Sequence, residues 1–393
     1  MFLISDKKLL AIIVLIAIAL RVFYCVGFIG KNLQDDGVYI TEAQKILDGR
    51  VHFNKLTFEK PLNPIEQFPL RIGFNYPLAL CIKLFGKSDI SLSLFPILCS
   101  IVMLFTTYKI ALISYNRTTA LMASGLFAIF PFDILWSTRV LSDETVGMWI
   151  ALAFLMFLGE KTKHIILCGI CLGMAYLNKS IAIPFAALFL MLTVYKKPIN
   201  AIYFVFGFCV VWSLEYWLYG SMFYHYRVDA STNVFKFVKD GSGEIPFGYI
   251  TIKFAHYLIW YFEFLLMGVK EATEGMRGDL AFTYLAIIGM SIRSNKNGLF
   301  LLIFTILTYL ILEIAPIGFA IKNNTLVWER IISQARFLTV LTVPLVIFAA
   351  VGLIQLYRRC SMLGIVAGIL LLITSYYSLT TNYHVLILEK LRK

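Results

Sequence analysis

Long apolar runs recur along the whole chain, and this repetition constrains the fold more than any other feature of the sequence. A helix of about 20 apolar residues crosses the hydrocarbon core of a bilayer and satisfies its own backbone hydrogen bonds there. Several runs are shorter, but together they predict an all-α polytopic membrane protein with about eleven transmembrane helices. The runs begin near Leu9, Ser91, Ala120, Val146, Ile165, Ile181, Ala201, Leu280, Leu299, Phe337 and Met362.

The composition argues against a soluble domain with a single membrane anchor. Hydrophobic residues make up 60% of the chain and charged residues 15%, whereas soluble domains carry about 25% charged residues. No stretch is polar enough for a separate soluble domain, so residues 1–393 are predicted to form one transmembrane domain. No small-residue cleavage site follows the first run, which predicts a retained helix and not a signal peptide.

Basic residues cluster in short connections between the apolar runs. This accounts for the formal net charge of +12 without a nucleic-acid partner. Short loops rich in Lys and Arg stay in the cytoplasm, and each of these loops falls after an even number of crossings, which predicts a cytoplasmic N-terminus. The basic connections contain Lys7 and Lys8, Lys109 and Arg117, Lys161 and Lys163, Lys196 and Lys197, Arg293 and Lys296, and Arg358 and Arg359.

The two long connections, residues 31–90 and 219–278, are then predicted to face outward. The apolar stretches Phe74–Phe85 and Phe254–Val269 would break the alternation if they crossed, so we expect them to lie as helices in the outer interface, where Tyr and Trp are favoured. The alternation also places Glu389–Lys393 outside although its charge favours the inside, which leaves a twelfth crossing open.

Carboxylates occur in two of the outward connections. Asp35 and Asp36 follow the first helix, and such a pair can supply a general base or bind a divalent cation. They can equally be the acidic start of a helix over Val38–Leu47. In the short outward connection Trp136–Thr145, Asp143 and Glu144 follow Arg139, and an alternative to a functional site is a helix cap at Ser142 with a local ion pair.

Cations also occur in outward connections. Lys179 lies in a tight outer turn, the wrong side for a lysine that only sets topology, and an ammonium there suits a lipid phosphate. Its structural alternative is a snorkelling anchor. Arg71 precedes Tyr76, Arg336 opens a late helix and Arg21 lies in the outer third of the first helix, and each guanidinium can bind phosphate bidentately. Acids and cations on one face therefore suggest a reaction on a phosphorylated lipid.

The cysteines carry no comparable signal. Cys168 and Cys171 have a C-x-x-C spacing, but they lie inside an apolar run without a second pair. We interpret them as small residues of a membrane helix and not as a metal or redox site.

The polar motifs follow one another in a recognisable order. They are Asp35-Asp36-Gly-Val-Tyr39, then Arg71 with Tyr76-Pro77 and Leu-Phe-Gly86, then Pro131 with Ser137, Arg139 and Asp143, then Gly169 and Gly173 with Lys179, and finally Arg336-Phe337 with Pro344. This order resembles the GT-C glycosyltransferases of the protein-mannosyltransferase and aminoarabinose-transferase type. Those polytopic enzymes use sugars carried on polyprenyl or dolichyl phosphate.

The resemblance implies a role for each candidate residue. Asp35 or Asp36 would be the general base on an acceptor hydroxyl, with a possible divalent cation at this pair, and Asp143 would position the acceptor or assist a metal. The predicted substrate-binding residues are Arg71, Tyr76, Arg139, Glu144, Lys179 and Arg336, of which Arg71, Lys179 and Arg336 would hold the lipid phosphate. The resemblance also implies that the configuration at the anomeric carbon of the sugar inverts. Two departures are the Asp-Asp pair where Asp-Glu is common and the absence of a soluble domain after the last run.

Other functions stay open from the sequence. A transporter or glycolipid flippase would place its polar site near the bilayer midplane and show repeats, which we do not find. A phosphoryl or acyl transferase on an outer-leaflet lipid would need the same acids and cations. The acceptor can be a protein, a lipid or a glycan, and the Ile-, Asn- and Lys-rich chain favours a bacterial inner membrane with the site facing outward.

Overall fold

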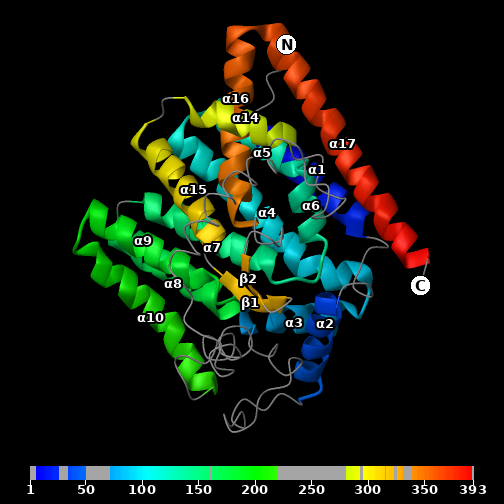
Figure 1. Cartoon of the computed structure of the whole chain (residues 1–393), viewed down its shortest axis with the longest axis vertical. Helices are drawn as coiled ribbons and strands as arrows, with labels where there is room; N and C mark the ends of the chain where they lie inside the picture. The colour runs from blue at the N-terminus through cyan, green and yellow to red at the C-terminus, as the bar shows by residue number, and fades with distance from the viewer. Residues whose placement is uncertain are drawn as a thin grey trace.

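The computed structural model describes residues 6–25, 34–49, 71–159, 161–219, 280–292, 295–314, 316–322, 325–330 and 339–391 (Figure 1). These residues form mostly helices, which pack around one another as a bundle. The helices are α1 (Asp6–Cys25), α2 (Gln34–Leu47), α3 (Ile72–Phe85), α4 (Asp89–Ser114), α5 (Arg117–Ala128), α6 (Pro131–Ser137), α7 (Asp143–Leu158), α8 (Thr162–Asn178), α9 (Ala182–Lys196), α10 (Asn200–Tyr219), α14 (Leu280–Met290), α15 (Lys296–Ile314), α16 (Thr342–Arg359) and α17 (Ser361–Leu391).

Apolar helices long enough to cross a bilayer confirm the predicted all-α membrane fold. Among the described residues, five helices meet the length and hydropathy that a span requires, namely α1, α4, α10, α16 and α17. The pair α5 and α6 would make a sixth, broken span with a bend of 55°. The number of about eleven crossings stays a prediction, because α3, α9, α14 and α15 are apolar but shorter.

One element was not predicted. Strand β1 (Pro316–Lys322) pairs antiparallel with β2 (Thr325–Arg330) in the connection between the apolar runs that begin near Leu299 and Phe337, where the sequence analysis indicated no strand. Figure 1 shows this hairpin near α2 and α3 at the lower end of the bundle, whereas the turn between α16 and α17 lies at the upper end. The other predicted interfacial helix, Phe254–Val269, lies outside the described residues.

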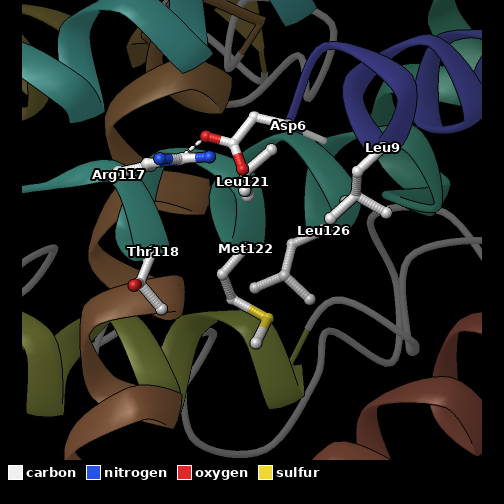
Figure 2. A pocket seen from close by; sticks show the side chains of 8 residues that line it. Asp6, Leu9, Arg117, Thr118, Leu121, Met122 and Leu126 are labelled. Carbon is white, nitrogen blue, oxygen red and sulfur yellow. Dashed lines mark ion pairs between the residues drawn. The ribbon is translucent and has the colours of Figure 1, made fainter. Parts of the chain in front are cut away.

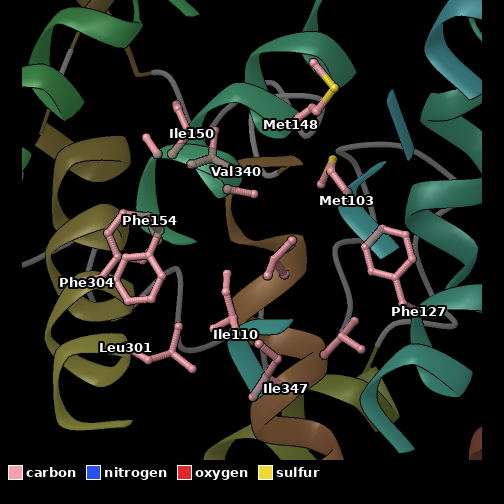
Figure 3. Close-up of a cluster of buried hydrophobic side chains, with 14 of the residues drawn as sticks. Met103, Ile110, Phe127, Met148, Ile150, Phe154, Leu301, Phe304, Val340 and Ile347 are labelled. Atoms are coloured by element: carbon pink, nitrogen blue, oxygen red, sulfur yellow. The ribbon is translucent and has the colours of Figure 1, made fainter. Parts of the chain in front are cut away.

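The core of the bundle is a continuous cluster of apolar side chains from most of the helices. Figure 3 shows part of it, where Phe154 of α7 packs on Phe304 of α15 with ring centroids 4.7 Å apart. Phe157 meets Phe300 one turn further along, with centroids 5.5 Å apart. These contacts are large and specific in geometry, so they fix α7 against α15.

A break between α5 and α6 is stabilised by a buried arginine. Pro131 starts α6 and has no N–H to donate, so the backbone carbonyls at the end of α5 need other partners. Arg21 of α1 donates from Nη1 to the Ala128 carbonyl at 3.2 Å and from Nη2 to the Phe127 carbonyl at 3.4 Å. The guanidinium therefore replaces hydrogen bonds that these carbonyls lose at the bend.

The charge of that arginine is balanced by a carboxylate on α6. Arg21 forms an ion pair with Asp133, and both side chains have no solvent exposure. Ser100 of α4 accepts a hydrogen bond from Arg21 Nε at 2.7 Å and donates one to Asp133 Oδ2 at 2.6 Å. The pair thus joins α1, α4 and α6 at one point of the interior.

The connections that carry the basic residues gather at one end of the bundle. Arg117 pairs with Asp6, and Asn295 Nδ2 donates to the Ile113 carbonyl at 3.2 Å. Lys196 Nζ donates to the Phe157 carbonyl at 2.8 Å and lies 4.9 Å from the ring centroid of Phe300, close to the start of α15. The starts of α1, α5 and α15 therefore share an end with the ends of α7 and α9.

Close packing of α14 on α16 provides a test of the bundle. A Cβ added at Gly352 would collide with the backbone carbonyl of Leu285, and one added at Gly289 with that of Phe348. We expect Gly352→Ala to lower the free energy of unfolding by about 1–3 kcal/mol, because the two backbones must separate. The measurement is the thermal denaturation midpoint in detergent.

The matched control is Gly368→Ala on α17. A Cβ at Gly368 meets no atom within 4 Å, so the same substitution there should leave the midpoint unchanged or raise it slightly. Equal midpoints for the two variants would contradict the close approach.

Candidate active site

Polar side chains from four segments meet where α2, α3, α7 and α8 come together. α2 contributes Asp36 and Tyr39, the residue before α3 contributes Arg71, the α6–α7 connection contributes Arg139 and Ser142, α7 begins with Asp143, and α8 is followed by Lys179. We call these seven residues the polar cluster. The segments are separated by long stretches of sequence, so tertiary packing alone brings them together.

Asp36 and Tyr39 are three positions apart on α2 and therefore face the same side of the helix. Asp36 is fully buried, and its Oδ2 lies 3.9 Å from Nη1 of Arg139. The Tyr39 hydroxyl and the Ser142 Oγ form a hydrogen bond of 3.0 Å. Asp35 belongs to the same helix, but its side chain lies outside the described residues.

Ser142 has a different role from the one predicted. It occupies the N-cap position of α7, but its side chain makes no cap hydrogen bond. Its hydroxyl is instead bonded to Tyr39 and accepts from Arg71 Nη1 at 3.1 Å. Arg71 also lies over the Tyr39 ring, 5.2 Å from its centroid. The predicted N-cap position is confirmed, but the hydroxyl does not cap the helix because tertiary partners occupy it.

Asp143 and Lys179 form a buried ion pair between α7 and α8. Lys179 Nζ lies 2.5 Å from Asp143 Oδ1, and their side chains are 9% and 2% exposed, respectively. Asp143 is the first residue of α7, where the helix dipole favours a negative charge. Asp143 therefore pairs with the residue that follows α8, whereas its spacing from Arg139 suggested a local pair.

Three further predicted residues, Tyr76, Glu144 and Arg336, are not members of the polar cluster. Tyr76 is on α3 and is 38% exposed. Glu144 is buried near three charged side chains, namely Asp133, Arg21 and Asp143. Arg336 lies outside the described residues, but Thr339 shortly after it donates to the Asp143 carbonyl at 3.2 Å.

Sequence reasoning did not single out Asp133, although a signal for it was present. It is a carboxylate inside the apolar stretch that follows Ala120, and an ionisable residue there needs a buried partner. The partner, Arg21, was considered as a phosphate ligand, because nothing local in the sequence pairs α1 with α6. Only the bend after α5 brings the two together.

The described residues contain no group of three or more His, Cys, Asp or Glu side chains that could hold a metal. Asp36 and Asp143 have cations as neighbours, from Arg139 and Lys179. Cys168 and Cys171 are buried in α8 as free thiols. A divalent cation at Asp35 and Asp36 stays a prediction.

Comparison with known proteins gives a consistent picture. Residues 69–217 match the family described as dolichyl-phosphate-mannose-protein mannosyltransferase, a range that includes Arg71, Asp143 and Lys179. Among solved structures, ArnT from Cupriavidus metallidurans bound to undecaprenyl phosphate aligns with a TM-score of 0.58 at 16% identity, over 91% of this chain and 62% of that chain. The chain has the GT-C fold. This confirms the resemblance that the motif order indicated.

Archaeal oligosaccharyltransferases share the fold as well. The Archaeoglobus fulgidus enzyme tethered to an acceptor peptide aligns with a TM-score of 0.57 at 13% identity, over 96% of this chain and 54% of that chain. AglB from the same organism, in complex with an inhibitory peptide and a dolichol-phosphate, aligns with a TM-score of 0.54 at 13% identity, over 98% of this chain and 55% of that chain. The chain thus spans between about half and two thirds of these relatives. No curated protein sequence matches it.

The buried pair of Asp143 and Lys179 generates a prediction about stability. Lys179→Met leaves a carboxylate buried without its cation, so we expect the free energy of unfolding to fall by about 3–5 kcal/mol. The double variant Asp143→Leu, Lys179→Met removes both charges and should recover most of that loss, because well-packed apolar residues replace a buried pair at little penalty. Thermal denaturation in detergent measures both effects. A double variant as unstable as Lys179→Met would contradict the pairing.

Proposed function

We propose that the protein is a membrane glycosyltransferase that moves a sugar from a polyprenyl or dolichyl phosphate to an acceptor hydroxyl. The observation that carries the proposal is the polar cluster, in which two carboxylates, Asp36 and Asp143, lie among the cations Arg71, Arg139 and Lys179. Acids for proton transfer and cations for a phosphate are the groups that this reaction needs. The shared fold with proteins that bind undecaprenyl phosphate and dolichol-phosphate supports it.

The reaction follows from the charges. The acceptor hydroxyl oxygen attacks the anomeric carbon of the sugar and gives its proton to an aspartate, which is Asp36 or Asp35. The bond from the anomeric carbon to the phosphate oxygen breaks, and the electron pair leaves with the lipid phosphate. Arg71, which is half-buried, and Lys179, which is buried, stabilise the charge that develops there, and a cation acts more strongly where water is excluded. A single displacement of this kind inverts the anomeric centre.

Depth and sidedness support an outward-facing site. The polar cluster is built from the segments that follow α1, precede α3 and α7, and follow α8. The basic connections contact one another at the other ends of these helices, through Arg117 with Asp6, Asn295 with Ile113 and Lys196 with Phe157. Because short basic loops stay in the cytoplasm, we infer that the cluster faces the other side, in a bacterial inner membrane with its site toward the periplasm or cell wall. A lipid-linked donor is suited to that side, where soluble nucleotide sugars are absent.

Replacing Asp36 tests the base. We expect Asp36→Asn to lower kcat for sugar transfer by about 10²–10⁴-fold, because the amide cannot accept the acceptor's proton. Purified protein is incubated with labelled polyprenyl-phosphate sugar, and released lipid phosphate and transferred sugar are both counted. Asp35→Asn, measured alongside, shows which of the two acids is the base.

The control for the base is Asp48→Asn. Asp48 directly follows α2, and its carboxylate accepts from Gln44 at 2.8 Å near the exposed end of that helix. This variant should transfer sugar at the normal rate. Full activity of both Asp35→Asn and Asp36→Asn would refute a catalytic role for the acidic pair. Labelled substrate that crosses the membrane of proteoliposomes without bond cleavage would show that the protein is a transporter and not a glycosyltransferase.

Replacing Arg71 tests the phosphate side. Arg71→Lys keeps the charge but loses the planar fork that bonds Ser142 and lies over Tyr39. We expect the KM for the lipid donor to rise by about tenfold or more, since one bidentate contact is worth roughly 1.5–3 kcal/mol. Lys83→Gln, which removes an exposed cation from the last turn of α3, is the matched control and should leave KM unchanged. An unchanged KM in Arg71→Lys would show that Arg71 does not bind the lipid donor through its guanidinium.

A further inference from the structure

A cavity of about 430 Å³ lies between the start of α1 and α5, at the end of the bundle opposite the polar cluster. Its wall is apolar over most of its length. Leu9 of α1 forms one side, and Leu121, Met122 and Leu126 of α5 form the other. Figure 2 shows these side chains around the cavity, with Met122 and Leu126 away from its polar end. Gly125 lies between them and leaves space, since a Cβ added there meets no atom within 4 Å.

The polar end of the cavity is formed by Asp6, Arg117 and Thr118. The ion pair between Arg117 and Asp6 uses Nε of the guanidinium. The Arg117 side chain is 65% exposed, and a guanidinium has five N–H donors, so its outer nitrogens remain able to bind an anion. Lys7 and Lys8 follow Asp6 on α1 and are exposed, so cations outnumber the single carboxylate at this end.

The residues around the cavity indicate whether water or a lipid chain occupies it. Ile12, Leu15 and Ile16, further along α1, are 44%, 66% and 45% exposed, respectively, as expected of a helix that faces lipid chains. The cavity therefore opens toward hydrocarbon along its length and toward headgroups at its polar end. Water would find no hydrogen-bonding partners along such an apolar groove, whereas an acyl chain makes dispersion contacts with its wall.

We propose that this groove binds an anionic glycerophospholipid of the cytoplasmic leaflet. One acyl chain lies along Leu121, Met122 and Leu126, and the phosphate accepts hydrogen bonds from Arg117. The charge is complementary, because Lys7, Lys8 and Arg117 face a leaflet that is rich in anionic lipids. The proposal is independent of the glycosyltransferase reaction, whose lipid phosphate binds at the other end of the bundle.

The bound lipid would hold α1 against α5. Arg21, which fixes the break between α5 and α6, is on the same α1 helix that forms one side of the groove. A ligand that binds only the folded protein raises the denaturation midpoint in proportion to the logarithm of its concentration over its Kd. The anionic lipid should therefore stabilise the protein. A substitution that fills the groove with a side chain, or one that removes the Arg117 charge, should abolish that stabilisation.

Two variants test the groove from its two ends. Gly125→Leu adds a side chain at a position where a Cβ meets no atom within 4 Å, and Leu is a better helix former than Gly, so the variant should fold. Arg117→Gln removes the phosphate ligand at an exposed position. Native mass spectrometry of the purified protein should show a retained anionic phospholipid in the wild type and at least a tenfold smaller fraction of it in each variant.

Two controls match these changes elsewhere on the lipid-facing surface. Gly368→Leu on α17 also adds a side chain where no atom lies within 4 Å. Arg358→Gln removes an exposed cation from the last turn of α16. Both should retain the phospholipid as the wild type does. In nanodiscs with and without phosphatidylglycerol, the wild type and both controls should show a higher midpoint with that lipid, and Gly125→Leu and Arg117→Gln should not.

Three results would overturn the proposal. One is equal phospholipid retention in all five proteins. The second is retention of phosphatidylcholine as strong as that of phosphatidylglycerol and unchanged by Arg117→Gln, because the groove would then be apolar packing without a phosphate site. The third is a retained polyprenyl phosphate in place of a glycerophospholipid.

Discussion

Two ion pairs buried between helices organise the described part of this protein. Arg21 with Asp133, and Lys179 with Asp143, are buried ion pairs whose members come from different helices. A lone charge in the bilayer interior is costly, and the penalty is removed only by a close partner and further hydrogen bonds. Each pair therefore fixes which helices must be neighbours. The first pair joins α1 to α6, and the second joins α7 to α8, where the polar cluster forms.

The bend between α5 and α6 shows how one pair affects the geometry of the other. Within a membrane a helix can break only where its freed carbonyls find donors. Arg21 supplies those donors to Phe127 and Ala128, so α6 can turn by 55° away from α5. The short α6 then leads directly into the connection that carries Arg139 and Ser142. The buried arginine thus helps to place residues that it does not touch.

Sequence patterns predicted what is local and missed what depends on packing. The apolar runs and the motif order carry the membrane class, the GT-C fold and the helices over residues 38–47 and 74–85, because each is encoded by neighbouring residues. The partner of Asp143 and the role of Ser142 were not predictable, because their ligands come from α8, α2 and the start of α3. The hairpin of β1 and β2 is local and was missed although a signal was present, since Asn323 and Asn324 separate two short runs that contain β-branched and aromatic residues.

The two contacts between α1 and α5 have a consequence for their relative placement. Asp6 pairs with Arg117 at the start of both helices, and Arg21 reaches Ala128 near the other end, so the helices run parallel. At about 1.5 Å per residue, these contacts are roughly 22 Å apart along α1 and roughly 16 Å apart along α5. The long arginine side chains and a tilt between the helices take up the difference. Two contacts on one helix pair determine both its register and its tilt, so a lipid that strengthens the contact at Arg117 also limits the movement of Arg21 at the bend.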